Sequence, residues 1–369
     1  MKFRRSAALL LGTALALTAA ACGGGDDDTR SDTTGETRAP ETVPTTSRVV
    51  TTTAGSSSTT VEETTTTAVP LPTAPLTGLP VADPAILARP ALAVKMDNHR
   101  DAMPHSGLNQ ADVVYEEIVE GITRFFVIFH SGDAAPIGPI RSARTTDVEL
   151  LNQLSRPLFA WSGGNRGVVN AIGNANAESR AHGQAPGFYR DQERRRRTDL
   201  EHTLMNESTT ILFATAVPGQ GPPPQMFEFL AEGESFEGDP AVAISTKLNS
   251  VPVTWLWDAA QGLWIRSQYN EPHVDVGGVP ISGHNVIFQF CDYRTSPADP
   301  GSPEAVTVGS GEAWIFSDGK LVKGTWDRPD ASVPATFEDA DGKPVKFTPG
   351  RTWIELAEAG DTEVGVLQG

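Results

Sequence analysis

The sequence predicts an α/β domain, a mixed sheet flanked by helices, followed by a smaller, mostly antiparallel β domain. In residues 75–232, apolar runs alternate with helical patterns, which is typical of an α/β layer fold. In residues 233–358, short strand-like runs at even spacing with Asp-Gly turns favour a sandwich or barrel. Residues 22–74 are rich in Thr, Ser, Gly and Pro, which predicts a disordered tether. Residues 1–21 and 359–369 are interpreted as a lipoprotein signal peptide and a tail.

The first residues predict export. Lys2, Arg4 and Arg5 precede an apolar run over residues 7–16 that is too short to span a bilayer as a helix. Small residues then lead to Cys22, a pattern that resembles a bacterial lipobox, in which the thiol is acylated and becomes the new N-terminus. An ordinary signal peptide cut near Cys22 is the alternative. We therefore expect an extracytoplasmic protein, lipid-anchored at the outer face of the cytoplasmic membrane.

The net charge limits the class of ligand, and the cysteine content limits disulfide formation. The formal net charge is −17, and so acidic a surface disfavours nucleic acid and anionic lipid headgroups as ligands. The basic run over residues 193–197 is interpreted as a solvated loop or helix entry. If Cys22 is acylated, Cys291 has no disulfide partner. Because Cys291 ends an apolar strand-like run, we expect a buried and inert thiol.

The first folded segment contains several predicted strands and two helices. Strands are expected at residues 91–96, 113–119, 124–130 and 157–161, and helices from residue 145 and over residues 168–172. In the third of these strands, Phe125, Val127 and Phe129 point to one face and the residues between them to the other. Thr145, with Asp147 in the first turn after it, is typical of a capped helix start.

The second folded segment is rich in short strands and in tryptophan. Strands are expected at residues 251–257, 263–267, 285–291, 305–308, 313–316, 325–326, 344–347 and 352–356, with a hairpin turn at 317–320. Six of the seven tryptophans lie in this segment: Trp255, Trp257, Trp264, Trp314, Trp326 and Trp353. Stacking on sugars is one use of such residues, but in a small β domain most are expected to pack in the core.

Several segments occur in one order along residues 75–357. They are Ala93-Val94-Lys95-Met96-Asp97-Asn98, residues 106–116, 120–125 and 137–144, Val308-Gly309-Ser310-Gly311, Gly324-Thr325-Trp326 and residues 350–354. Together they resemble the YerB family of bacterial lipoproteins, a two-part family of domains of unknown function. The resemblance implies an extracytoplasmic lipoprotein. Two segments depart from it: Trp161-Ser162-Gly163-Gly164 replaces a His-Gly-Gly arrangement, and Glu201-His202-Thr203-Leu204 replaces a Pro-His-Asn-like motif.

The densest polar cluster, residues 141–147, precedes a predicted helix. On a first helical turn Arg141 and Arg144 would share a face, and two guanidiniums beside helix amides suit a carboxylate or phosphate. The turn at Ser162-Gly163-Gly164 offers a second such position, at the ends of adjacent strands where α/β sheets usually bind ligands. The alternative is internal pairing of both arginines with nearby acids: Asp97, Glu116, Glu117 and Glu120.

The leading hypothesis is a non-enzymatic envelope lipoprotein that binds an anionic wall component, or a wall-synthesis protein, through this cleft. Arg124, Arg141 and Arg144 would hold the charge. The remaining predicted ligand-binding or positioning residues are Asp97, Asn98, Glu117 and Ser142. The β domain would act as a partner platform or a lid. A pure protein scaffold without a small ligand is a further alternative.

The competing class is an envelope hydrolase that acts on a glycan or an ester. Ala160-Trp161-Ser162-Gly163-Gly164 resembles a nucleophile elbow. Four histidines follow it in the order that a Ser-Asp-His triad would need: His182, His202, His273 and His284. A carboxylate pair that includes Glu117 is the other route to catalysis, so the catalytic candidates are Ser162 and Glu117.

Metal binding has little support in the sequence. His99 and His105 lie near Asp97 and Asp101, but no HExxH or comparable ligand spacing occurs. The Gly-rich turns also lack the lysine of a phosphate-binding P-loop. The sequence therefore predicts neither a metal nor a cofactor.

Overall fold

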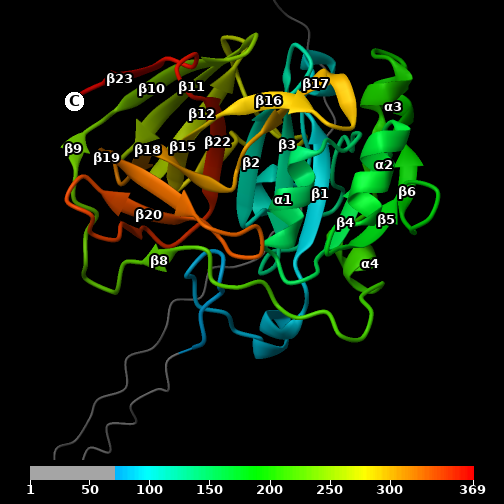
Figure 1. Ribbon diagram of the computed structural model, residues 1–369, viewed down its shortest axis with the longest axis horizontal. Coiled ribbons are helices and arrows are strands. Elements are labelled where there is room, and N and C mark those ends of the chain that lie inside the picture. Colours follow the sequence, from blue (N-terminus) through cyan, green and yellow to red (C-terminus); the bar gives the residue numbers. More distant parts are fainter. Residues whose placement is uncertain (1–70) are drawn as a thin grey trace, which may run out of the picture. The chain divides into compact units, whose positions relative to one another are not determined.

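A mixed sheet of eleven strands runs through the described chain, residues 71–369 of the computed structural model (Figure 1). Cys22, the predicted signal peptide and all but the last residues of the predicted tether lie outside the described residues. The sheet has the order β20-β19-β18-β15-β22-β2-β3-β1-β4-β5, with β9 paired to β19. Mixed strand directions, as predicted, are confirmed.

The large sheet draws its strands from both halves of the sequence. From the first half come β1 (Leu92–Asp97), β2 (Val113–Ile118), β3 (Thr123–Phe129), β4 (Leu158–Trp161) and β5 (Glu178–Ala181). From the second half come β9 (Asp239–Pro240), β15 (Asn285–Cys291), β18 (Gly309–Ser317), β19 (Lys320–Arg328), β20 (Thr336–Asp339) and β22 (Thr352–Glu358). Strand β22 lies between β15 and β2, parallel to both, and so joins the halves in one sheet. The boundary between residues 232 and 233 stays a prediction.

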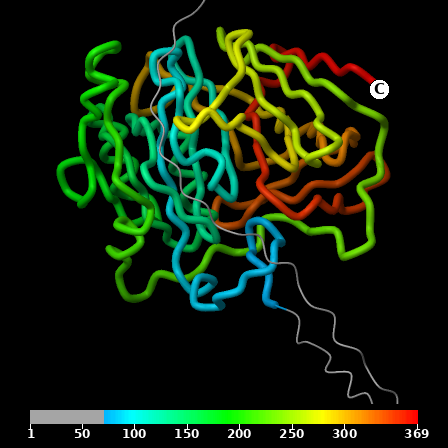
Figure 2. The backbone as a smooth tube through the Cα atoms, turned by 180° about the vertical axis from the view of Figure 1, so that it is seen from behind, coloured from blue at the N-terminus to red at the C-terminus, as the bar shows by residue number. Residues whose placement is uncertain are grey.

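A second, antiparallel sheet belongs to the C-terminal half. Its strands are β10 (Ala243–Leu248), β11 (Val251–Asp258), β12 (Leu263–Gln268), β13 (Glu271–Pro272), β14 (Ser282–Gly283) and β23 (Val364–Leu367). The antiparallel C-terminal β region predicted from the sequence is therefore confirmed. Strand β23 pairs with β10, so part of the predicted tail, residues 359–369, is built into this sheet. Figure 2 shows the C-terminal strands gathered on one side of the molecule and the first strands on the other.

Helices are fewer and shorter than an α/β layer fold predicts. They are α1 (Thr146–Asn152), α2 (Arg166–Gly173), α3 (Gln192–Arg195) and α4 (Thr209–Phe213), with short 3-10 turns η1 (Pro84–Ala88), η2 (Arg100–Ala102), η3 (Leu108–Gln110) and η4 (Leu200–His202). The described fold is mostly β, which corrects the expectation of regular strand–helix alternation. None of the helices in residues 71–369 is long and apolar enough to cross a membrane.

Three small two-stranded sheets complete the described fold. They are β6 (Phe188–Arg190) with β7 (Leu204–Asn206), β16 (Tyr293–Ser296) with β17 (Asp299–Ala305), and β8 (Glu228–Phe229) with β21 (Lys346–Phe347). The strand predicted over residues 305–308 is wrong, because β17 ends at Ala305. Thr307 instead donates its hydroxyl to Glu149 and accepts a bond from Arg328.

The predicted alternation in β3 is confirmed by two separate cores. Phe125, Val127 and Phe129 pack into one core, between the two sheets, whereas Phe126 and Ile128 pack into the other. Four of the six tryptophans in the second folded segment are buried as predicted: Trp255, Trp264, Trp326 and Trp353. Cys291 is buried as predicted, and burial raises the pKa of its thiol to about 12.

Candidate functional site

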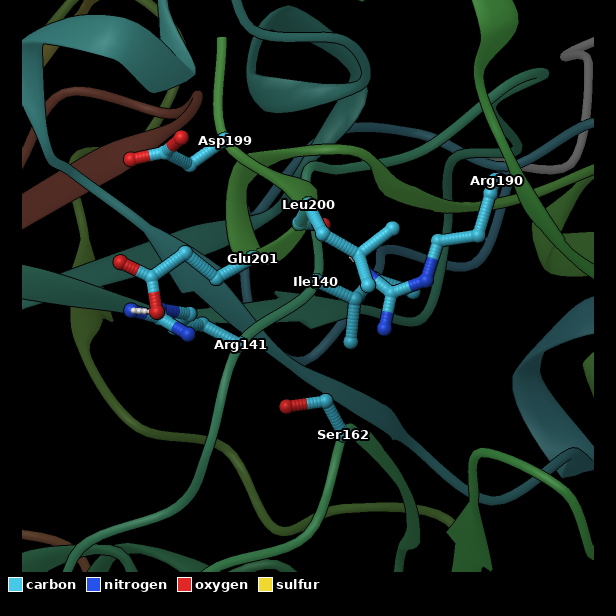
Figure 3. Close-up of a pocket in the computed structure, with 7 residues that line it drawn as sticks. All are labelled: Ile140, Arg141, Ser162, Arg190, Asp199, Leu200 and Glu201. Atoms are coloured by element: carbon cyan, nitrogen blue, oxygen red, sulfur yellow. Dashed lines mark hydrogen bonds and ion pairs between the residues drawn. The ribbon is translucent and has the colours of Figure 1, made fainter. Parts of the chain in front are cut away.

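A cavity of about 490 Å³ lies beside the carboxyl ends of the parallel strands β1 and β4 (Figure 3). It is lined by Ile140, Arg141, Ser162, Arg190, Asp199, Leu200 and Glu201. Ser162 directly follows β4, and Arg190 ends β6. The cavity thus occupies the sheet edge at which the sequence predicted a ligand site.

Backbone bonds fix Arg141 at the strand ends. Its N–H donates to the Lys95 carbonyl of β1 at 2.9 Å, and its carbonyl accepts from the Ser162 N–H at 3.0 Å. The chain here is extended, and α1 begins only at Thr146. Arg141 and Arg144 therefore do not share the face of a helical turn, which corrects the sequence expectation. They reach different partners.

Arg144 is saturated by the protein's own acid. Its Nε and Nη2 atoms donate to the two carboxylate oxygens of Glu120 at 2.8 and 2.6 Å. Burial would raise the pKa of Glu120, but hydrogen bonds from Arg144 and Ser302 outweigh it and lower that pKa to about 2. Arg144 does not line the cavity. For this residue the structure shows the internal pairing that the sequence left as an alternative.

Arg141 is also paired, but it faces the cavity. Its Nη2 lies 3.0 Å from Glu201 and its Nε lies 3.3 Å from Asp97. The Nε is buried without a hydrogen-bond partner of good geometry, and the side chain stays 20% exposed. In Figure 3 the guanidinium of Arg141 meets the Glu201 carboxylate at the cavity wall. The end of the guanidinium that a ligand could reach is therefore the one that contacts Glu201.

Arg190 supplies the second guanidinium of the cavity. It is placed by the pairing of β6 with β7, in which Arg190 lies opposite Leu204. Its Nη1 donates to the Leu200 carbonyl at 2.6 Å. Burial lowers its pKa, and the positive charges of Arg141 and Arg195 lower it further. Among the described residues no acid lies within ion-pair distance of Arg190, so its charge is not compensated by direct pairing.

Behind Arg141, Asp97 orients an imidazole. Nδ1 of His202 lies 2.7 Å from Oδ2 of Asp97, and both side chains are buried. Burial would raise the pKa of Asp97, but the bond from His202 and the charge of Arg141 bring it below its ordinary value. The same bond raises the pKa of His202, while burial opposes this change. The other ring nitrogen of His202, Nε2, lies 3.6 Å from the Glu201 carboxylate.

The other predicted site residues lie away from the cavity lining. Asn98 is buried between the two sheets, where it donates to Glu116. Glu117 is buried against Lys95, and burial raises its pKa to about 7. Arg124 is 6% exposed and donates to the Ser142 carbonyl at 2.7 Å. Burial, with the charges of Arg144 and Arg141, lowers its pKa to about 10.

The two serines of the predicted site contact each other. Oγ of Ser142 lies 3.3 Å from Oγ of Ser162, which lines the cavity. In residues 71–369, Ser162 makes no hydrogen bond to His202, so the two do not form a nucleophile–base pair in this structure. Glu117 is fully buried and has no path to a glycan.

Sequence reasoning did not assign Arg190, Asp199 or Glu201 to the site. Their positions depend on the β6–β7 pair and on η4, neither of which has a periodic sequence signal. His202 was noticed only as a possible triad member and as part of a departure from the family pattern. Its bond to Asp97 joins residues 105 positions apart, and no local pattern marks such a contact.

Comparison with known proteins identifies the family. Residues 76–216 match the family described as "Protein of unknown function (DUF3048) N-terminal domain". Residues 242–354 match its C-terminal domain. The chain belongs to this family. The two matches flank the segment in which β8 and β9 lie, and β22 brings both into one sheet.

A curated relative and a solved structure agree with this assignment. The family member "Putative lipoprotein YerB" of Bacillus subtilis (strain 168) is 28% identical over 294 residues, covering 77% of this chain and 85% of that protein. The crystal structure of YerB protein from Bacillus subtilis has a TM-score of 0.68 at 24% identity, covering 79% of this chain and 99% of that chain. The fold is therefore shared with that structure, and the resemblance predicted from the sequence is confirmed.

Proposed function

We propose that this protein is a lipoprotein, anchored through Cys22 at the outer face of the cytoplasmic membrane, that binds a carboxylate or phosphate group of a cell-wall polymer. One observation carries the proposal: Arg141 and Arg190 line the same cavity. The name of the Bacillus subtilis relative supports the lipoprotein part. The ligand class follows from the chemistry of the cavity.

The two guanidiniums of the cavity suit an anion that displaces Glu201. The chain carries a net charge of −17, yet here burial, followed by the positive charges of Arg141 and Arg195, lowers the pKa of Arg190. Bringing like charges together costs free energy, which a bound anion would offset. Guanidiniums suit carboxylate and phosphate because their N–H groups match the geometry of these anions. The hydroxyl of Ser162 adds a neutral donor to the lining.

Glu201 occupies the place that we assign to the ligand. Its side chain is 53% exposed, and its carboxylate rests on Nη2 of Arg141 at 3.0 Å. An exposed ion pair of this kind contributes only about 0–1 kcal/mol to stability, so an external anion can replace it at little cost. Glu201 would then swing outward, and Arg141 and Arg190 would bind the incoming group together.

The proposal is tested with the full chain purified in detergent. Retention on purified anionic wall fragments, and calorimetric titration with inorganic phosphate, are measured for wild type and for the Arg141→Gln/Arg190→Gln double variant. We expect both kinds of binding to weaken by roughly tenfold or more, about 1.4 kcal/mol. Arg144→Gln is the matched control, because Arg144 pairs with Glu120 outside the cavity. Unchanged binding in the double variant, or a protein partner without wall or phosphate affinity, contradicts the proposal.

Hydrolysis is the second candidate, and the contact between His202 and Asp97 favours it. A histidine held by a carboxylate is the arrangement that general bases use. Ser162 would have to move to reach Nε2 of His202, because its hydroxyl contacts the hydroxyl of Ser142. Incubation with wall polymer and product analysis by mass spectrometry separates the two functions. Turnover that disappears in Ser162→Ala would favour hydrolysis over binding alone.

A further inference from the structure

We propose that His99, Asp101 and His202 form a binding site for a divalent transition-metal ion such as Zn²⁺, with Glu201 as a fourth ligand. One potential ligand atom from each of the first three residues lies within 4.8 Å of the other two. The site adjoins the anion cavity, because Arg141 contacts both Glu201 and Asp97, but its first three ligands do not line that cavity. The sequence predicted no metal, because these ligands come from segments about a hundred residues apart.

His202 already has the orientation of a metal ligand. An ionised carboxylate only accepts hydrogen bonds, so the contact with Asp97 places a proton on Nδ1 of His202. In the neutral imidazole the lone pair then lies on Nε2. Asp97 is itself held by the backbone N–H of His99 at 3.0 Å and is fully buried. Metal-binding histidines almost always have such a carboxylate or carbonyl partner on the second nitrogen.

His99 and Asp101 can adjust to an ion because they lie at the surface. Their side chains are 41% and 53% exposed, and Nδ1 of His99, which accepts from the Asp101 backbone N–H at 3.2 Å, lies 3.6 Å from Oδ2 of Asp101. The His99 ring stacks on the His202 ring with centroids 4.5 Å apart and an interplanar angle of 15°. Parallel rings direct their lone pairs side by side. The exposed His99 ring must therefore turn to bring its nitrogen within about 2.1 Å of an ion held by His202.

The local charge also favours a divalent cation. Three carboxylates surround the two imidazoles: Asp97, Asp101 and Glu201. Arg141 supplies one positive charge in direct contact with two of them. Two imidazoles with carboxylate oxygens are a ligand set that suits zinc and its neighbours in the first transition row.

Two other histidines lack a free ring nitrogen for a metal ion. His105 and His273 are fully buried and bond to each other at 2.9 Å. The second nitrogen of His105 contacts the Asp97 carbonyl, and that of His273 contacts Arg266. Both nitrogens of each ring are in use. His202 differs, because its Nε2 has no hydrogen-bond partner among the described residues.

The test uses the full chain after dialysis against a chelator. Zn²⁺ is titrated by calorimetry, and Co²⁺ is added as a spectroscopic probe of coordination by nitrogen. We expect one ion per chain, roughly tenfold or more weaker binding in His99→Ala and Asp101→Ala, and a roughly 10–100-fold loss in Asp97→Asn. His99 and Asp101 are exposed, so we expect their variants to keep the fold, with the loss in His99→Ala confined to the η2 cap and the ring stacking on His202.

His182→Ala is the matched control, because His182 is exposed and lies outside the cluster. Its affinity for Zn²⁺ should equal that of wild type. Failure of wild type to take up one Zn²⁺ at about 100 µM, or unchanged affinity in both His99→Ala and Asp101→Ala, overturns the proposal. Phosphate titration of the chelated protein runs in parallel, so the anion proposal and the metal proposal can fail independently.

Discussion

Two polar clusters meet at the end of β1, and they use similar residues in different ways. The cavity cluster comprises Asp97, Arg141, Arg190, Glu201 and His202. The sealed cluster comprises Asn98, His105, Glu116, Arg266, Gln268, His273 and Glu355, all fully buried. Neighbouring residues of one strand end thus direct their side chains to the two clusters.

Proton positions in the sealed cluster follow from its contacts. The Asp97 carbonyl only accepts, so Nε2 of His105 donates to it at 2.7 Å, and Nδ1 of the neutral ring accepts from His273. The remaining nitrogen of His273 then accepts from Arg266 at 2.8 Å. Burial lowers the pKa of both histidines, which agrees with neutral rings. The chain of donors and acceptors leaves no place for a ligand.

Charge in the sealed cluster is balanced internally. Nη2 of Arg266, on β12, donates to Glu116, on β2, at 2.5 Å. Glu116 also accepts from Asn98 and from Thr123 at 3.0 and 2.6 Å. The pair connects the second sheet to the large sheet and therefore links the two halves that the family descriptions match. In the cavity cluster, by contrast, Arg190 is unpaired with any described acid, and Arg141 lines the cavity with a side chain that stays 20% exposed. Complete burial indicates a structural role, whereas partly exposed guanidiniums beside a cavity indicate binding.

The largest expected effect is the loss of stability when the sealed pair is broken. Glu116→Gln removes the counter-charge of Arg266 in a fully buried setting and should lower the free energy of unfolding by about 3–5 kcal/mol. Denaturant unfolding of wild type and Glu116→Gln measures this difference in free energy. Glu355→Gln is the control in the same cluster. Burial, followed by the charge of Glu116, raises the pKa of Glu355 well above its ordinary value, so it is a neutral acid that Gln resembles. We expect a change below about 1 kcal/mol, and equal effects in both variants would contradict the assignment.

A second prediction concerns acid pH. Burial lowers the pKa of His105 from 6.5 to about 4, so the unfolded chain binds more protons than the native state between these values. Stability is therefore full above pH 6.5 and falls as the pH drops toward 4, by up to about 1.4 kcal/mol per pH unit for each such histidine. Unfolding of wild type and His105→Gln is compared across this range. The variant should show a shallower slope, and parallel slopes would argue against a neutral His105.

The third prediction is that the cavity cluster contributes more to phosphate binding than to stability. Arg141→Gln should lower the free energy of unfolding by less than Glu116→Gln does, because its pair with Glu201 is partly exposed and the buried Asp97 keeps its contact with His202. The same variant should weaken phosphate binding. A stability loss as large as that of Glu116→Gln would place Arg141 with the structural residues.

The smallest effect is expected for Arg144→Gln. Its pair with Glu120 lies at the surface, so the loss of stability should stay near or below about 1 kcal/mol. Phosphate affinity should match wild type, because Arg144 lies outside the cavity lining. Weaker phosphate binding in this variant would restore Arg144 to the site that the sequence predicted.

Local sequence patterns were sufficient for much of the sheet but not for the site. Alternation in β3 and the Asp-Gly turn between β18 and β19 are short-range signals, and the structure has both. Arg141 and Arg144 could not be distinguished, because only the tertiary path decides which one meets Glu120. Arg190 and His202 were not assigned to the anion site, because η4 and the β6–β7 pair bring them to β1 from far along the chain. The helix at Thr146 was expected, but its cap was not as predicted: the Thr145 hydroxyl bonds to Ser296.

The most direct measurement is a calorimetric titration of Arg190→Gln with inorganic phosphate. Arg190 has no acid partner among the described residues, so its replacement breaks no ion pair and removes a positive charge from the cavity. We predict native-like thermal unfolding together with phosphate binding roughly tenfold or more weaker than that of wild type. Phosphate affinity equal to that of wild type would contradict anion binding in this cavity.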